Sequence, residues 1–337
     1  MTVSTHARRP RTHMTGAAST AVRPVLESPR RRARVLAAFP AGIYLEVRTE
    51  LEPSVIAIIT GAATRLPNAI VLAGDLPHVT MGDEAAVGEG VIEIGRLRLR
   101  ARRWWDPAPP LGRVDPVRLA ALPQGLAALP QGHVLPQGQA LSRGHAGPSG
   151  HTAPSGHAAP SGHAGPEPGL AGHPAVDLLA GACAKGWLLG AVSAAEQLVG
   201  LGPGLTPSGD DVLAGLLVTL RHLGTAAGVE RAVWLADWLA ATVTYDARSR
   251  TTPISAALLH CAARGESCPE VSAVLRALTG RQLLEPSLAR LHRLGHTSGA
   301  DLAQGVAIGL AAVRSLAAAP GSRGSRRRKT LLRGGAR

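Results

Sequence analysis

The sequence lacks the apolar runs and the cysteine pairs that mark membrane and disulfide-rich proteins. No uncharged apolar stretch reaches the roughly 18 residues that a membrane helix needs, so we expect no membrane partner. The three cysteines, Cys183, Cys261 and Cys268, form no C-x-x-C pair, and any pairing leaves one over. We therefore expect no disulfide framework, no cysteine-based zinc site, and a reducing, cytoplasmic location.

Acidic residues are scarce at the two ends of the chain. Residues 1–34 hold eight Arg against Glu27 alone, and residues 314–337 hold no acid, which gives these ends +7 and +8 of a total of +13. The rest of the chain is therefore close to neutral. Basic tails bind polyanions weakly, so we expect no specific nucleic-acid partner, although a polyanion-binding role driven by the tails is an alternative.

The segment that follows the first basic tail superficially resembles an export signal. Arg30–Arg32 precede the apolar run Val35–Leu45. Pro40 and Gly42 interrupt this run, and no small-residue cleavage site follows it. We interpret the run as a first core strand.

The pattern of residues 33–107 is typical of a β-rich domain. Short apolar or alternating runs are separated by Gly, Pro and Asn. They are Val35–Phe39, Ile43–Val47, Val55–Ile59, Ala69–Leu72 and Val91–Leu99. The last run alternates from Glu93 onward, which predicts one strand with a buried face and an exposed basic face.

Residues 108–173 contain a low-complexity region rich in Pro, Gly and His. Leu-Pro-Gln-Gly occurs three times, and a six-residue unit beginning with His repeats from His145. Such a segment has too little apolar surface to offset its ordering entropy, so we expect a disordered linker. Metal binding by the repeated imidazoles is an alternative, but evenly spaced His in such a repeat more often reflects duplicated coding sequence than selected ligands.

Residues 174–317 show helical periodicity. Apolar residues from Val212 to Leu223 lie on one helix face, and Gly224 predicts the end of that helix. Thr252 and Pro253 predict the N-cap and first turn of another helix, with Gly265 at its end.

These patterns predict an α+β chain with a small β-rich N-terminal domain and a mainly helical C-terminal domain, joined by a disordered linker. The expected division is a basic tail at 1–32, the β-rich domain at 33–107, the linker at 108–173, the helical domain at 174–317 and a second basic tail at 318–337.

The densest chemical signal is the run G-L-G-P-G-L-T-P-S-G-D-D at residues 200–211. Its glycines allow close backbone approach to a ligand, and the helix start that follows favours an anion. We expect Gly202, Gly204, Thr206, Ser208 and Gly209 to hold a small anion. A well-capped helix after a tight loop is the structural alternative, because Ser208-x-x-Asp211 resembles a capping box.

A second segment repeats this pattern. Ser208–Gly215 and Ser298–Gly305 share S-G-x-D-x-x-x-G, ninety residues apart. Each pattern begins a helix with a hydroxyl cap, and Gly215 and Gly305 would allow the two helices to approach closely. The two N-termini could then converge on one anion, which adds Ser298, Gly299 and Asp301 to the candidate site.

Three other features are candidates for the same site. Thr251 and Thr252 precede a further helix and lie beside Arg248 and Arg250. These arginines could bind a carboxylate or phosphate, or the segment could be a solvated loop. His296 could act as a general acid or base, or simply cap a helix. Asp210 and Asp211 are adjacent acids that project about 100° apart on a helix, so we expect them not to chelate a metal together.

Several familiar motifs are absent. No Lys follows the last glycine of the 200–211 run, so it is not a Walker A loop, and it is not a dinucleotide-binding fingerprint either. No Ser/His/Asp triad has a recognisable spacing. We expect no cofactor and no metal.

The three motif segments together resemble the AllH family. These are residues 200–211, Arg250–Ser255 and Gly295–Gly305, and the segments around Leu66–Asn68 and Val91–Pro107 also fit the family's first part. That family includes a subunit of a bacterial oxamate carbamoyltransferase of allantoin and purine catabolism. The resemblance implies carbamoyl transfer between oxalurate and phosphate, giving oxamate and carbamoyl phosphate, with AllF-like and AllG-like partner subunits.

Within this resemblance, no catalytic residue is assigned; Asp210, Asp211 and His296 are the candidates. The competing interpretation is a non-catalytic scaffold or a regulatory subunit that binds a small anion.

Overall fold

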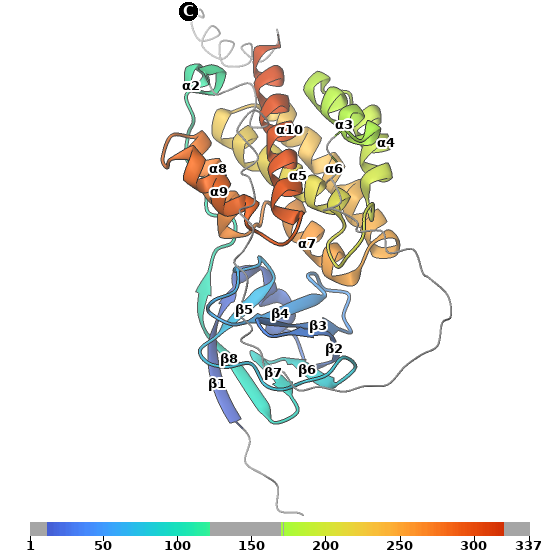
Figure 1. Cartoon of the computed structure of the whole chain (residues 1–337), viewed down its shortest axis with the longest axis vertical. Helices are drawn as coiled ribbons and strands as arrows, with labels where there is room; N and C mark the ends of the chain where they lie inside the picture. Colours follow the sequence, from blue (N-terminus) through green and yellow to red (C-terminus); the bar gives the residue numbers. More distant parts are fainter. Residues whose placement is uncertain (1–11, 122–169, 171, 320–337) are drawn as a thin grey trace, which may run out of the picture.

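The computed structural model describes residues 12–121, 170 and 172–319, and it contains a β-barrel and a helical domain (Figure 1). The strands are β1 Thr12–Ser19, β2 Arg31–Phe39, β3 Gly42–Val47, β4 Val55–Ile59, β5 Ala69–Leu72, β6 Glu84–Gly88, β7 Val91–Ile94 and β8 Leu97–Trp105. The short helices η1 Thr20–Val22 and α1 Arg23–Leu26 follow β1.

The eight strands form a closed barrel in the order β1-β5-β4-β3-β2-β6-β7-β8. β1 pairs in parallel with β8, β4 pairs in parallel with β5, and the other neighbours are antiparallel. The predicted fold class is therefore wrong in its first part: the N-terminal unit is a closed barrel rather than a generic small β-rich domain. Closure removes both sheet edges, which an open sheet of this size would expose.

Two features of the barrel were not evident from the sequence. β1 and the start of β2 lie within residues 12–32, which were expected to form a tail. The expected strand at Val91–Leu99 is a hairpin, because Gly95 adopts a φ of 52° and turns the chain between β7 and β8. Arg98 and Arg100 still alternate with buried Leu97 and Leu99, as predicted.

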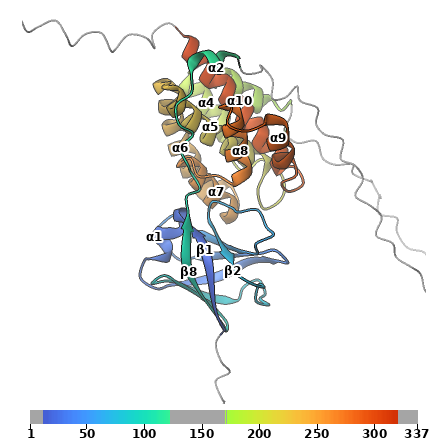
Figure 2. The ribbon, with the colours of Figure 1, turned by 90° about the vertical axis from the view of Figure 1, so that its left-hand side faces the viewer.

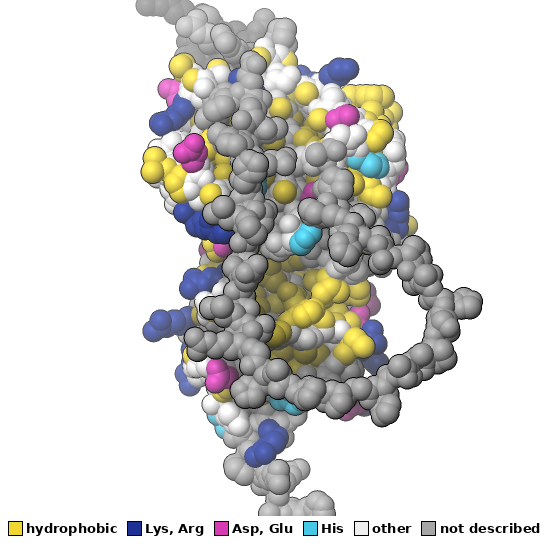
Figure 3. Space-filling view, viewed as in Figure 1, with side chains coloured by type: hydrophobic (Ala, Val, Ile, Leu, Met, Phe, Trp, Pro, Cys, Tyr) yellow, Lys and Arg dark blue, Asp and Glu magenta, His cyan; other side chains and the backbone are white. Residues whose placement is uncertain are grey.

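Strand β4 joins the barrel to the helical domain because it is apolar on both faces. Ile56 and Ile58 point into the barrel core. Val55 points outward and packs against Ile254 and Ala257 of α7. All five β4 residues are buried, and hydrophobic side chains gather on the barrel face beneath the helical domain (Figure 3).

The helical domain contains α2 and the helices after the low-complexity region (Figures 1 and 2). Their bounds are α2 Pro116–Ala121, α3 Pro174–Lys185, α4 Leu188–Leu198, α5 Ser208–Ala227, α6 Glu230–Arg250, α7 Pro253–Ala263, α8 Pro269–Leu278, α9 Leu284–His292 and α10 Ser298–Ala318. Helix α2 falls within the expected linker, yet Leu119 is buried in the helical core. The His-Pro-Gly repeats lie outside the described residues.

Two predicted helix ends have different outcomes. Thr252 caps α7 by accepting from the N–H of Ser255, and Gly265 follows this helix with a φ of 81°, as predicted. Gly224 does not end α5, which continues to Ala227 and is capped by Gly228 with a φ of 68°. Gly224 instead allows α6 to pack closely, because a Cβ there would meet Ala232 at 3.1 Å.

Among the described helices, α10 is long and apolar enough to cross a membrane by length and composition alone. Its most apolar 18-residue window is 56% buried in the protein, where it packs against α5, α3 and α9. A buried core helix passes the same test of length and composition.

Candidate functional site at the crossing of α5 and α10

The two S-G-x-D-x-x-x-G segments cross each other. A Cβ on Gly215 would lie 2.3 Å from the carbonyl oxygen of Leu302, and one on Gly305 would lie 2.1 Å from that of Val212. Only glycine at both positions allows this backbone contact between α5 and α10. The first turns of both helices are thereby brought together on the side of the helical domain nearest the barrel (Figure 1).

The similarity extends to the helix that precedes each crossing helix. Gly209 donates its N–H to Leu201, and Gly299 donates to Leu294. Leu201 and Leu294 in turn donate to the last turns of α4 and α9. The pairs α4–α5 and α9–α10 are thus two copies of one helix–loop–helix arrangement, packed against each other.

The two helix starts are linked by hydrogen bonds in both directions, each from a hydroxyl of one helix to a carboxyl of the other. Asp211 accepts hydrogen bonds from Ser298 of α10 and from Thr206 of its own loop. Asp301 accepts from Ser208 of α5. Thr206 Oγ1 and Ser298 Oγ are 3.1 Å apart. We call these five residues the crossed cluster.

Burial makes the two acids of the crossed cluster unusual. Asp211 and Asp301 are 7% and 1% exposed. Desolvation raises the pKa of Asp211 to about 8, with a smaller contribution from the charge of Asp301. Desolvation also raises the pKa of Asp301. One carboxyl oxygen of each, Oδ2, has no hydrogen-bond partner among the described residues, so each acid retains an unused polar atom.

Asp210 points to a different part of the domain. It accepts hydrogen bonds from the N–H of Gly200 at 2.8 Å, from Ser255 Oγ at 2.6 Å, and from the Thr251 hydroxyl. Thr252 Oγ1 donates to the carbonyl of Leu205 at 2.6 Å. Asp210 and the two threonines therefore connect the 200–207 loop to the start of α7, and their polar atoms are occupied.

The expected anion donors are placed less uniformly than the sequence suggested. The N–H groups of Gly209 and Gly299 are used within the protein. Gly202 and Gly204 lie in the exposed part of the loop, with φ values of 113° and 93°. His296 is exposed at the turn before α10. The crossing thus gathers Thr206, Ser208, Asp211, Ser298 and Asp301, whereas Asp210, Thr251 and Thr252 form a separate group.

Among the described residues, neither Arg248 nor Arg250 forms an ion pair with an acid of the crossed cluster. Arg250 pairs with Asp246 one turn earlier, at 3.1 Å, and Arg248 is exposed. No group of three or more His, Cys, Asp or Glu side chains able to hold a metal ion occurs in the described parts of the chain. The three cysteines are buried and free.

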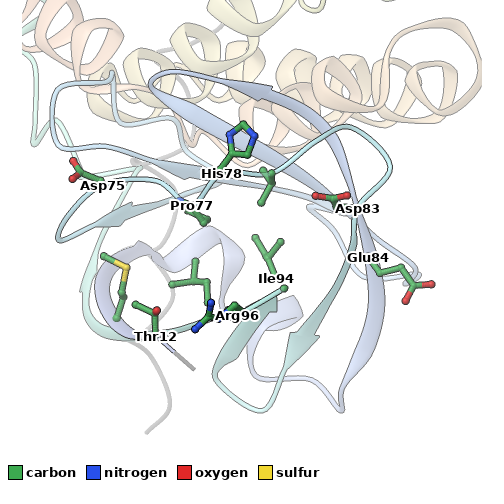
Figure 4. A pocket seen from close by; sticks show the side chains of 12 residues that line it. Thr12, Asp75, Pro77, His78, Asp83, Glu84, Ile94 and Arg96 are labelled. Carbon is green, nitrogen blue, oxygen red and sulfur yellow. The ribbon is translucent and has the colours of Figure 1, made fainter. Parts of the chain in front are cut away.

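Sequence patterns did not indicate a pocket of about 650 Å³ in the barrel. It lies between the start of β1, the β7–β8 turn and the β5–β6 loop (Figure 4). Met14, Ile94 and Leu97 line it, while Asp75 and Glu84 lie at its rim and point outward in Figure 4. Its residues are scattered along the chain, so only the closed barrel brings them together.

The segment that contains the helix crossing matches a known protein family. The family model described as oxamate carbamoyltransferase subunit AllH covers the last residue of α4 through most of α10. Residues 198–310 match the AllH family. The resemblance noted from the three motifs is confirmed over this segment, which contains both crossing helices and the Asp210 connections. No solved structure matches the chain.

The AllH match does not extend to the barrel or to α3. The expected resemblance of residues 33–107 to the family's first part therefore stays a prediction. The family name is that of an oxamate carbamoyltransferase subunit, and the matched segment contains the crossed cluster, of which Ser208, Asp211 and Asp301 are buried.

Proposed function

We propose that this protein is the AllH-type subunit of an oxamate carbamoyltransferase-like enzyme and that the crossed cluster binds a small anionic substrate. The observation that carries the proposal is the pair of buried acids with unused oxygens, set among three hydroxyls within the AllH segment. Phosphate, carbamoyl phosphate, oxamate and oxalurate are the anions considered. AllF-like and AllG-like chains are the expected partners.

The raised pKa of Asp211 supports an anion in this place. With a pKa of about 8, most of this carboxyl is protonated and neutral at pH 7. A neutral carboxyl does not repel an anion, and its O–H can donate a hydrogen bond. The N-termini of α5 and α10 add partial positive charge. Thr206 and Ser298 can reorient their hydroxyls toward the ligand.

The same arrangement suits carbamoyl transfer. In the proposed reaction, a phosphate oxygen forms a bond to the carbamoyl carbon of oxalurate, and the bond from that carbon to the oxamate nitrogen breaks. The departing nitrogen gains the proton that phosphate loses. In this proposal Asp211 relays the proton, and the hydroxyl donors stabilise charge on the transferring group.

A ligand titration tests the proposal. Thermal unfolding of the protein is measured with increasing phosphate, carbamoyl phosphate, oxamate and oxalurate, alone and co-expressed with AllF-like and AllG-like chains. We expect a saturating rise in the unfolding temperature with at least one anion. Ser298→Ala should abolish this rise, whereas Ser193→Ala, on the exposed face of α4, should not. No rise in either preparation would contradict the proposal.

A non-catalytic scaffold is the second candidate. It is favoured by the internal use of many polar groups, since Asp210 alone accepts three hydrogen bonds that hold the loop to α7. Carbamoyl transfer that needs this chain but is unchanged in Ser298→Ala and Asp211→Asn would support the scaffold. Loss of turnover with intact assembly in these variants would support the catalytic role.

A further inference from the structure

The outer face of α6 carries an aromatic stripe that no function described above uses. Trp234 is 50% exposed, Trp238 52% and Tyr245 80%. The chain has only five Trp, two Tyr and one Phe. Three of these eight aromatic side chains are thus at least half exposed on a single helix. Figure 2 shows α6 along the outer edge of the helical domain. Exposed Trp and Tyr of this kind are typical of protein interfaces.

The spacing of the stripe matches a helical partner. With Ala241 included, its positions are separated by four, three and four residues, which is the apolar repeat of two helices packed side by side. The rings of Trp234 and Trp238 are 6.1 Å apart, edge to face, so they form one continuous surface. A second helix laid along α6 would cover all four positions.

We propose that the aromatic stripe of α6 packs antiparallel against the same stripe of a second copy of this chain. In an antiparallel pair centred between Leu239 and Ala240, Trp238 meets Ala241 of the other copy, and Trp234 meets Tyr245. A large side chain then faces a small one at the centre, and aromatic pairs lie on both sides. The same helix thus supplies both halves of the interface, as a two-fold dimer requires.

Charge at the ends of the stripe favours the same pairing. Glu230 and Arg248 are both exposed, and they are 18 residues apart, which is five helical turns. They therefore lie along the same edge of α6. A two-fold antiparallel pair brings equal edges together, and in this register Glu230 of each copy is level with Ser249 of the other, one residue from Arg248. Opposite charges at both ends fix the register.

The contact area sets the expected strength. The exposed parts of the three aromatic side chains amount to roughly 350 Å² on each copy. A specific interface needs about 1,000 Å² in total, so the flanking charged side chains must contribute the remainder. We expect a reversible dimer that dissociates on dilution.

Sedimentation or light scattering of the full chain over a range of concentrations tests the proposal. We expect a monomer–dimer equilibrium that Trp238→Asp abolishes. The matched control is Leu283→Asp, which places the same charge on an exposed leucine before α9 and should leave the dimer intact. Circular dichroism confirms that both variants fold.

A charge exchange tests the register. Glu230→Arg and Arg248→Glu should each weaken the dimer by roughly tenfold, because like charges then face each other. The double variant should restore most of the lost affinity. A chain that stays monomeric, or a dimer that is indifferent to Trp238→Asp, would overturn the proposal. A stripe that binds only a different subunit would overturn it as well.

Discussion

Asp210 and Asp211 are neighbours in sequence, but their side chains leave α5 in different directions and meet different elements. Asp210 reaches the loop and the start of α7, whereas Asp211 reaches α10. The divergence of about 100° was predictable from helical geometry. Which acid would be fully hydrogen-bonded was not predictable, because the answer depends on Thr251 and Ser255, more than forty residues further along the chain.

Replacing Asp210 should destabilise the fold strongly. Asp210→Ala leaves three donors without their acceptor in a buried place, so we expect a loss of about 3 kcal/mol in the free energy of unfolding. Urea denaturation measures this loss. Asp246→Asn is the control, because Asp246 accepts from the partly exposed Arg250 in its own helix. A similar loss in both variants would argue against the connecting role of Asp210.

Asp211 should make stability depend on pH. Its folded pKa of about 8 lies above the ordinary value of 3.8, so the folded state retains a proton that the unfolded state has released. The free energy of unfolding therefore falls as pH rises from about 4 to 8, by up to about 1.4 kcal/mol per pH unit, and then levels off. Asp211→Asn removes this titration.

The measurement is the difference in unfolding free energy between Asp211→Asn and the unaltered protein, taken from pH 4.5 to 8.5. We expect the asparagine variant to gain relative stability steadily toward pH 8. Asp301→Asn should shift the titration of Asp211 to lower pH, because the charge of Asp301 contributes to its raised pKa. A difference that is constant with pH would contradict the buried, protonated state.

At the level of elements, the helix crossing depends on small residues. The repeated S-G-x-D-x-x-x-G pattern predicted that two helix starts converge, and they do. The pattern did not predict that Gly209 and Gly299 lie against the backbone of the preceding helix, because those contacts involve Leu198 of α4 and Leu291 of α9. The cap at Thr252 was predicted correctly from adjacent residues. The expected hydroxyl caps at Ser208 and Ser298 were wrong, because Pro207 and Thr297 are the N-caps of α5 and α10 and neither makes a side-chain capping hydrogen bond. The end of α5 was not, because α6 packs over Gly224.

Alanine at the crossing should separate two opposing effects of removing glycine. Gly215→Ala and Gly305→Ala place a Cβ within 2.3 Å and 2.1 Å of backbone oxygens that cannot move independently. We expect each substitution to cost about 3 kcal/mol or more and to disturb the crossed cluster. Thermal and urea denaturation measure this cost.

Gly181→Ala in α3 is the matched control. Its Cβ would meet nothing within 4 Å, so only the helix propensity changes. We expect this variant to be more stable by about 0.5–1 kcal/mol. If all three alanine variants behaved alike, close backbone contact between α5 and α10 would not be the reason for glycine at positions 215 and 305.

At the level of the whole molecule, the order of the strands in the barrel could not be predicted from the sequence. Runs of apolar residues predicted β2 to β5 well, but β1 is the polar-to-small sequence T-H-M-T-G-A-A-S, which has little strand character. It forms a strand because its backbone pairs with β5 along one edge and with β8 along the other. Closure of the barrel is a property of all eight strands together, so no single segment could predict it.

Two N-terminal deletions should therefore differ sharply. Removal of residues 1–11 leaves every strand intact, so the unfolding temperature should change little. Removal of residues 1–32 deletes β1 and the start of β2, which exposes the edges of β5, β8 and β6. We expect the longer deletion to aggregate. Circular dichroism and light scattering distinguish the two, and equal behaviour would contradict the role of β1.

The parallel pairing of β1 with β8 also constrains the protein during its synthesis. Thr12 pairs with Leu97, and Ser19 pairs with Trp105, so the first strand of the barrel can pair with β8 only after all the barrel strands have been synthesised. Until then, one edge of β1 lacks its partner, although β5 is available for the other edge. Translation speed and chaperone binding before β8 is complete should therefore affect the yield of folded protein.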